Sequence, residues 1–111
     1  MKLPGYESAE IDLQKLRDYC LNPDHPVGKH KARVFRKKLG ITKKDSDILR
    51  QIILQAIESS KATEAGTDSY GSRYRCDFEI VMNNHRETIV TIWIIRSNEN
   101  HPSLVTCYLK T

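Results

Sequence analysis

The sequence predicts an α+β domain, in which about three N-terminal helices pack on one face of a C-terminal antiparallel sheet of three to four strands. Two patterns lead to this prediction. Apolar residues recur at helical spacing in the first half of the chain, and they alternate with polar residues in the second half. No internal repeat or long linker divides the 111 residues, so we expect a single domain over residues 1–111.

Three segments carry the helical pattern. The first closes at Asn22-Pro23, and the second follows Pro26-Val27-Gly28 and ends at Gly40. The third begins with Asp45 or Ser46 as its N-cap. The apolar stripes of these helices consist of Ile11, Leu13, Leu16, Tyr19 and Cys20 in the first, Ala32, Phe35 and Leu39 in the second, and Ile48, Leu49, Ile52, Ile53, Ala56 and Ile57 in the third.

The alternation of apolar and polar residues in the second half of the chain predicts a meander of three strands. The first alternates over residues 73–82, the second is apolar on both faces over 88–96, and the third alternates again over 103–110. Val105, Cys107 and Leu109 are expected on one face of the last strand, opposite Leu104, Thr106 and Tyr108. Turns are expected at residues 83–86 and 97–102. Residues 59–71 are mostly small or polar and are expected to form a loop.

Positive charge is concentrated in residues 25–44, HPVGKHKARVFRKKLGITKK. This stretch holds eight of the eighteen Lys and Arg residues and no acid, whereas all fourteen acids lie elsewhere. The net charge of +4 is too common to identify a partner. Its concentration in one stretch favours a polyanionic partner, and RNA is the candidate.

The three cysteines, Cys20, Cys76 and Cys107, lie in apolar patterns without CxxC spacing. We expect buried free thiols in a reducing compartment rather than disulfides or zinc ligands. The N-terminus lacks the apolar core of a signal peptide, and no segment approaches the length of a membrane span. These features predict a cytoplasmic protein without a membrane partner.

The motif His25-Pro26-Val27-Gly28-Lys29 suits an anion. Free amides at a helix start attract negative charge, and Gly28 allows close backbone approach. His25 can exchange a proton near neutral pH, and Lys29 adds charge. Lys29 is not followed by Ser or Thr, so the motif is no nucleotide P-loop. The alternative is a capped polar loop without a ligand.

Lys29, Arg33, Arg36 and Lys37 fall on one stripe of the second helix, with Lys31 nearby. Such a stripe binds a phosphate backbone through counterion release, so Lys31, Arg33, Arg36 and Lys37 are candidate nucleic-acid-binding residues. The alternative is a solvated helix face.

The outer face of the sheet carries Arg73, Thr106 and Tyr108. Arg73 can clamp a phosphate with two N–H groups, and the hydroxyls can orient a phosphate or pass a proton. Asp77 and Glu79 are expected to pair with Arg73 or Arg75 rather than to act as acid and base. No group of His, Cys, Asp and Glu has metal-ligand spacing, so no metal or cofactor is expected.

Several segments together resemble a family of small bacterial domains of unassigned function. They are KLPGYESAEIDLQKLRDYCLNPDHPVGKHKARVFRKKLGIT, then YGSRY, TIWII and LVTCY. The family pattern is close to LPxxxxAxIDxxKLxDYxLxxxHPxGxxKAxxFxxLG, then YGxxY, VWII and LVTxYP. The resemblance covers nearly the whole chain and implies a domain found alone or at the C-terminus of polymorphic toxins. The chain departs from the pattern after Tyr108, where Leu109 replaces the Pro.

The order of elements also looks like the barnase–EndoU–colicin–RelE superfamily of metal-independent ribonucleases. This looser resemblance implies that His25 acts as general acid or base while Lys29, Lys31 and Arg73 hold the scissile phosphate. Thr106 and Tyr108 would complete the site, and attack by the ribose hydroxyl would leave a cyclic phosphate.

Three functions therefore remain open. The first is a toxin-type RNA-cleaving domain, a candidate metal-independent endoribonuclease with a cognate antitoxin or immunity protein. The second is a non-catalytic module that binds nucleic acid or protein, such as the antitoxin or regulator of a toxin–antitoxin pair. The third is an adaptor whose basic helix contacts an acidic protein. Catalysis requires His25 and Lys29 to approach Arg73 or Tyr108 in one cleft, whereas binding requires only a continuous basic face.

Overall fold

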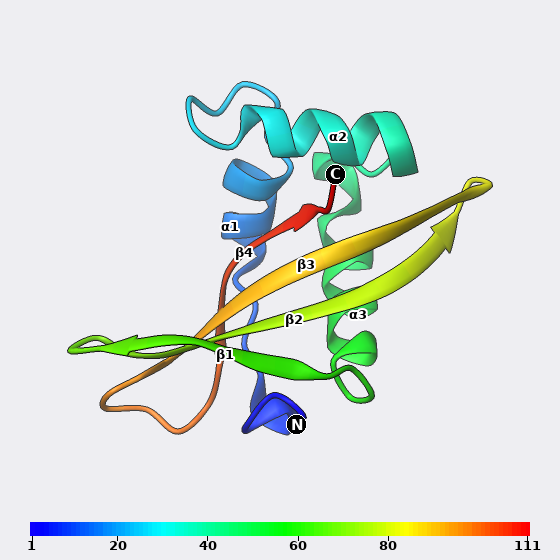
Figure 1. Cartoon of the computed structure of the whole chain (residues 1–111). Helices are drawn as coiled ribbons and strands as arrows, with labels where there is room; N and C mark the ends of the chain where they lie inside the picture. The colour runs from blue at the N-terminus through cyan, green and yellow to red at the C-terminus, as the bar shows by residue number, and fades with distance from the viewer.

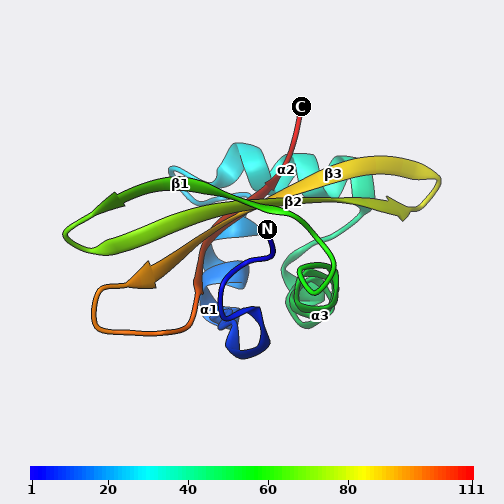
Figure 2. The ribbon, with the colours of Figure 1, turned by 60° about the horizontal axis from the view of Figure 1, so that its bottom comes forward.

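The computed structural model describes residues 1–111 and shows an α+β fold, as predicted, with the helices before the sheet. The helices are α1 (Leu13–Lys15), α2 (Lys29–Leu39) and α3 (Ser46–Ala56), and the strands are β1 (Ala62–Asp68), β2 (Gly71–Met82), β3 (His85–Arg96) and β4 (Ser103–Leu109). Figures 1 and 2 show α1 and α3 on one side of the sheet, with α2 lying across one end of both. None of the helices combines the length and the apolar character that a membrane-spanning helix requires.

The first predicted helix is only partly α-helical. After α1, residues Leu16–Cys20 form a π-helical turn, in which the Leu21 N–H donates to the Leu16 carbonyl at 2.8 Å. The wider turn places Leu16 and Cys20 on the buried side. The apolar spacing of this segment does not distinguish an α-helix from a π-helical turn, because both bury one side of the chain.

The other two helices follow the prediction closely. The buried face of α2 is Ala32, Phe35 and Leu39, and Gly40 ends the helix with a φ of 69°. Asp45 is the N-cap residue of α3, as predicted, but its side chain makes no capping hydrogen bond to that helix. The Asp45 side chain instead belongs to a capping box with Thr42, which is the N-cap of a short 3₁₀ turn, Lys43–Asp45, before α3.

The prediction of a loop over residues 59–71 was wrong, because these residues include strand β1. The four strands form one antiparallel sheet in the order β1-β2-β3-β4. Only Ala62 of β1 is buried, so this edge strand is held by backbone pairing and leaves no apolar pattern. The turn between β2 and β3 is also tighter than expected: it consists of Asn83 and Asn84, which have φ values of 51° and 65°.

A bulge in β4 changes which residues share a face. Ile92 pairs with Thr106 but Trp93 pairs with Leu104, so Val105 has no partner. Leu104 is consequently buried together with Cys107 and Leu109, and the expected grouping of Leu104 with Thr106 was wrong. Periodicity alone cannot reveal an extra residue in one strand.

One cluster of 18 buried residues joins the helices to the inner face of the sheet. At its centre the Thr91 hydroxyl donates to the Cys76 carbonyl at 2.6 Å and accepts from Trp93 Nε1 at 2.8 Å. Thr91 and Trp93 are fully buried, so they belong to the core rather than to a polar site. Cys20, Cys76 and Cys107 are buried free thiols, as predicted.

Candidate functional site

The His25 side chain closes the turn that leads into α2. Its Nδ1 accepts hydrogen bonds from the backbone N–H groups of Val27 and Gly28, each at 3.0 Å. Because Nδ1 is the acceptor, the neutral ring carries its proton on Nε2. The ring also packs edge to face against Tyr19, with 4.9 Å between the centroids. Two of the amides expected to attract an anion are therefore already bonded to the His25 side chain.

Gly28 allows the start of α2 to lie close against the π-helical turn. A Cβ atom at this position would lie 2.5 Å from the Tyr19 carbonyl oxygen. The sequence led us to expect an anion beside Gly28, but its near neighbour is the backbone of the π-helical turn. The residue is small because the loop before α2 packs directly on that turn.

Most of the predicted basic stripe lies on the solvent side of α2. Arg33, Arg36 and Lys37 are exposed and Lys29 is half-buried. Arg33 also donates to the Pro23 carbonyl at 3.4 Å, which ties the preceding loop to the helix. We call the following solvent-facing cations the basic surface: Lys29, Arg33, Arg36, Lys37, Lys38, Lys43 and Lys44.

Lys31 lies near β4 instead. Its Nζ is 4.8 Å from the centroid of the Tyr108 ring, a cation–π contact. Nearby, the Sγ of Cys20 lies 4.0 Å from the Oγ1 of Thr106. The structure therefore brings Lys31, Thr106 and Tyr108 to one place, where α2 and the π-helical turn meet β4.

Cys20 and Cys107 interact within this contact. The Cys107 thiol hydrogen-bonds to the Cys20 sulfur, which lowers the pKa of Cys20 to about 7, with help from Thr106 and Lys15. The same hydrogen bond, together with burial, raises the pKa of Cys107. Both residues have no exposed surface, so this pair acts as a packing contact between the π-helical turn and β4.

Arg73 lies in a different part of the sheet. It shares a rung with Ser103, whereas Tyr108 shares one with Asp77, and the two rungs are four residues apart along β2. That spacing corresponds to about 13 Å along the strand. Arg73 donates to Asp68 Oδ2 at 2.7 Å. The structure thus does not bring Arg73 to the place where Lys31 meets Tyr108.

The ion pairs of this protein all lie outside residues 25–44. The four arginines of β2 and β3 are each paired with an acid, and His101 contacts Glu10. Arg75 donates to both carboxylate oxygens of Asp77, at 2.9 and 3.0 Å, which confirms the predicted pairing of Asp77. The predicted pairing of Glu79 was wrong, because its carboxylate contacts Arg86 across the β2–β3 hairpin instead. The basic surface contains no such pair, so its charges face solvent uncompensated.

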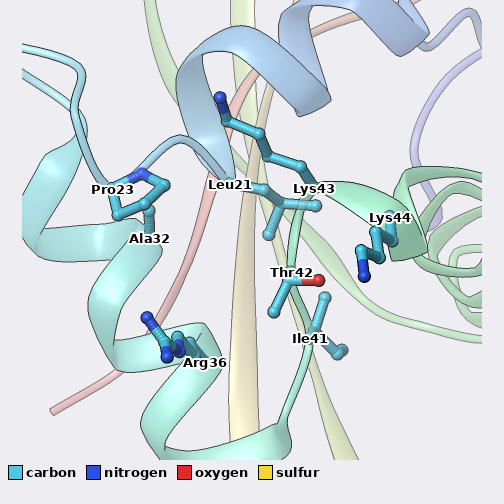
Figure 3. A pocket seen from close by; sticks show the side chains of 8 residues that line it. All are labelled: Leu21, Pro23, Ala32, Arg36, Ile41, Thr42, Lys43 and Lys44. Atoms are coloured by element: carbon cyan, nitrogen blue, oxygen red, sulfur yellow. The ribbon is translucent and has the colours of Figure 1, made fainter.

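A hollow of about 390 Å³ opens beside the basic surface, between the end of the π-helical turn, α2 and the segment before α3 (Figure 3). Its lining combines apolar side chains with cations: Leu21, Pro23, Ala32, Arg36, Ile41, Thr42, Lys43 and Lys44. A second hollow of about 380 Å³ shares Lys43 and Lys44 and adds Leu13, Arg17, Ser46 and Asp47.

Sequence reasoning missed this hollow. Lys43 and Lys44 contributed to the charge count of residues 25–44, but nothing assigned them a site. The apolar residues that accompany them come from three separate segments, and only the fold places these segments together. The concentration of charge could therefore be predicted from the sequence, whereas the hollow beside it could not.

The whole chain belongs to one family of domains. Residues 2–111 match the family described as "Domain of unknown function (DUF6883)". This membership agrees with the resemblance to a family of small domains without an assigned function. No curated protein matches the chain in sequence.

The fold is similar to a solved structure. One chain of a contact-dependent growth inhibition toxin – immunity protein complex from Klebsiella pneumoniae 342 superposes with a TM-score of 0.68. The match covers 90% of this chain and 98% of that chain, at 15% sequence identity. At this identity the likeness shows a common fold.

Proposed function

We propose that this chain is one member of a toxin–immunity-type pair and that it binds an acidic partner protein through its basic surface. The fold likeness to a chain from a toxin–immunity protein complex supports the class of system. The uncompensated charge of the basic surface supports binding of an acidic partner.

The distribution of ion pairs carries this proposal. Arg73, Arg75, Arg86 and Arg96 each have a carboxylate within 4 Å, so acids are available on this protein to neutralise exposed arginines. The seven cations of the basic surface have none. Like charges this close together along the chain repel one another, and a partner of opposite charge relieves that repulsion and speeds association.

An acidic protein suits this surface better than a single-stranded nucleic acid. Proteins that read unpaired bases stack them on aromatic side chains. Neither hollow beside the basic surface is lined by an aromatic residue. Tyr70, the most exposed aromatic residue, lies in the turn between β1 and β2 instead.

A competition between two polyanions tests the proposal. Fluorescence anisotropy would compare fluorescein-labelled poly-L-glutamate with a labelled RNA oligonucleotide of equal charge at about 0.15 M salt. We expect poly-L-glutamate to bind at least as tightly as the RNA. The double variant Lys43→Glu/Lys44→Glu should weaken its binding about tenfold or more. Lys61→Glu, an exposed charge outside the basic surface, is the matched control. Binding of the RNA alone would contradict the proposal.

RNA cleavage is the second candidate function, and the contact between Lys31 and Tyr108 favours it. This contact holds a cation over the ring of Tyr108, on the strand that also carries the Thr106 hydroxyl. In this candidate His25 exchanges the proton, while Lys29, Lys31 and Arg73 contact the phosphates of an extended RNA. Nδ1 is the unprotonated nitrogen of the neutral ring. To accept a proton from RNA, it must first release the N–H groups of Val27 and Gly28.

Incubation with RNA in EDTA tests the second candidate. We expect His25→Ala to lose cleavage if the histidine exchanges the proton. His25→Asn is the sharper variant, because an amide oxygen can still accept the two backbone hydrogen bonds but does not titrate near neutral pH. Absence of wild-type cleavage, or undiminished cleavage by His25→Asn, would remove RNA cleavage as a function.

A further inference from the structure

We propose that the 390 Å³ hollow beside the basic surface is the anchor pocket of the partner interface, and that it receives an aliphatic or aromatic side chain flanked by acids. This inference rests on the proposed function and makes it specific. It names where the partner docks and which chemistry its docking segment carries.

The floor of the hollow is apolar. Leu21, Ala32 and Ile41 are each 2–3% exposed, so they belong to the packed interior and only their surfaces toward the hollow remain open. Pro23 forms one wall. The volume is within the range of pockets that bury small apolar ligands or side chains. Covering such a floor removes apolar surface from water, which favours binding of an apolar group.

The rim of the hollow is cationic. Figure 3 shows Arg36 reaching from α2 and Lys43 and Lys44 from the opposite segment, so the charges surround the apolar floor. All three are exposed and none has an acidic partner. A carboxylate on either side of the anchor residue would meet one of these cations. Acidic flanks and an apolar centre therefore match the hollow in both charge and shape.

The backbone that presents Lys43 and Lys44 is held in place. The Thr42 N–H donates to Asp45 Oδ2 at 2.9 Å, and the Thr42 hydroxyl donates to the same oxygen at 3.4 Å. The Ser46 hydroxyl donates to the Lys43 carbonyl at 2.7 Å. This short turn is preorganised before a partner arrives, which lowers the entropy lost on binding.

A nucleotide fits the hollow less well. A buried base must find hydrogen-bond partners for its polar edge, and the floor offers only hydrocarbon. Thr42 is the one uncharged polar side chain in the lining, and its hydroxyl is already bonded to Asp45. The second hollow shares Lys43 and Lys44 and adds Arg17 beside Asp47. Three cations against one acid leave it net positive, so it suits the acidic flank of the same segment.

Two synthetic peptides test the anchor pocket. One is an acidic peptide with a central Leu between pairs of Glu, and the other has Ala in place of the Leu. Titration into ¹⁵N-labelled protein, followed by NMR, should shift the amide signals of Leu21, Ala32 and Ile41 with the Leu peptide. We expect the Leu peptide to bind about tenfold more tightly than the Ala peptide, the gain from burying the larger side chain.

Two variants and a control locate the effect. Ala32→Leu fills the hollow and should abolish the difference between the peptides, with retained folding checked by the dispersion of the NMR spectrum. Lys44→Glu should weaken the binding of both peptides, and Lys61→Glu should weaken the binding of neither.

Equal affinity of the two peptides would overturn the anchor pocket while leaving the acidic partner in place. Larger shifts at the floor with adenosine monophosphate than with the Leu peptide would also overturn it. Failure of poly-L-glutamate to bind would instead overturn the proposed function itself.

Discussion

At the scale of single residues, Asp68 holds Arg73 at the end of the β1–β2 hairpin. The sequence presented Arg73 as a phosphate clamp on the outer face of the sheet. Its guanidinium instead donates to Asp68 across the β1–β2 hairpin, and the other Asp68 oxygen accepts from the Tyr70 N–H at 2.9 Å. In this arrangement Arg73 closes the hairpin end. A phosphate that approached Arg73 would compete with Asp68 for its guanidinium.

We expect the Asp68 carboxyl to titrate below the ordinary Asp range, since the hydrogen bond from Arg73 lowers its pKa. Arg73→Gln should move the titration back toward the ordinary value, whereas Arg75→Gln should not. The lowered pKa means that the pair's contribution to stability is complete above the ordinary Asp pKa and is lost as the pH falls below it. NMR titration of the side-chain carboxyl carbon measures the effect. An unchanged midpoint in Arg73→Gln would show that the ion pair does not form in solution.

At the scale of elements, α2 is fixed at both ends by side chains from outside it. His25 Nδ1 accepts from the N–H groups of Val27 and Gly28 immediately before the helix, and the Asn83 Nδ2 donates to the Leu39 carbonyl at its end, at 2.6 Å. The second bond joins the β2–β3 hairpin to the helix. These contacts hold the basic surface at a set position against the sheet.

Gly28→Ala should lower the free energy of unfolding by about 1–3 kcal/mol, because the new methyl group overlaps the Tyr19 carbonyl. To make room for the methyl group, either the loop before α2 or the π-helical turn must move. Val27→Ala removes an exposed side chain next to it and serves as control. Urea denaturation measures both variants. Equal stability of Gly28→Ala and wild type would mean that the two segments are farther apart in solution.

The Asn83-Asn84 turn offers a matched pair of substitutions. Both residues have positive φ, which Gly adopts without strain. Asn84→Gly should therefore leave stability within about 0.5 kcal/mol of wild type. Asn83→Gly loses the hydrogen bond to Leu39 and should cost about 1 kcal/mol. Thermal unfolding of the two variants compares them directly, and a larger loss in Asn84→Gly would contradict the role of the Asn83 side chain.

At the scale of the whole molecule, a single core joins the helices to the sheet. Trp93 lies in this core, with its indole N–H bonded to Thr91. Because both residues lie on the central strand β3, the loss of this network should affect the entire fold. The protein should unfold in one cooperative transition that Trp93 fluorescence reports.

Thr91→Val should lower the free energy of unfolding by about 2–3 kcal/mol, since it leaves the buried Trp93 N–H without an acceptor and the Cys76 carbonyl without a donor from this side chain. Thr88→Val, on the same strand and half-buried, is the control and should have little effect. Denaturation followed by Trp fluorescence and by circular dichroism should give coincident curves. Two separate transitions would show that the sheet and helices do not form one unit.

The predictable parts of the molecule are those that carry a strong local pattern. The buried faces of α2 and α3 and the course of β2 and β3 follow from apolar spacing. β1 could not be predicted, because its pairing with β2 uses backbone groups and buries only Ala62. The bulge at Val105 and the π-helical turn likewise leave no mark in hydrophobic periodicity.

The amino-acid sequence by itself determined the fold class, the family and the concentration of positive charge in residues 25–44, because these depend on composition and on local spacing. Only the tertiary structure decided which residues meet. It separated Arg73 from Tyr108, placed Lys31 on Tyr108, and joined Leu21, Ala32 and Ile41 beneath Arg36, Lys43 and Lys44. A pocket depends on distances between segments remote in the chain, and those distances are set by how the helices pack on the sheet.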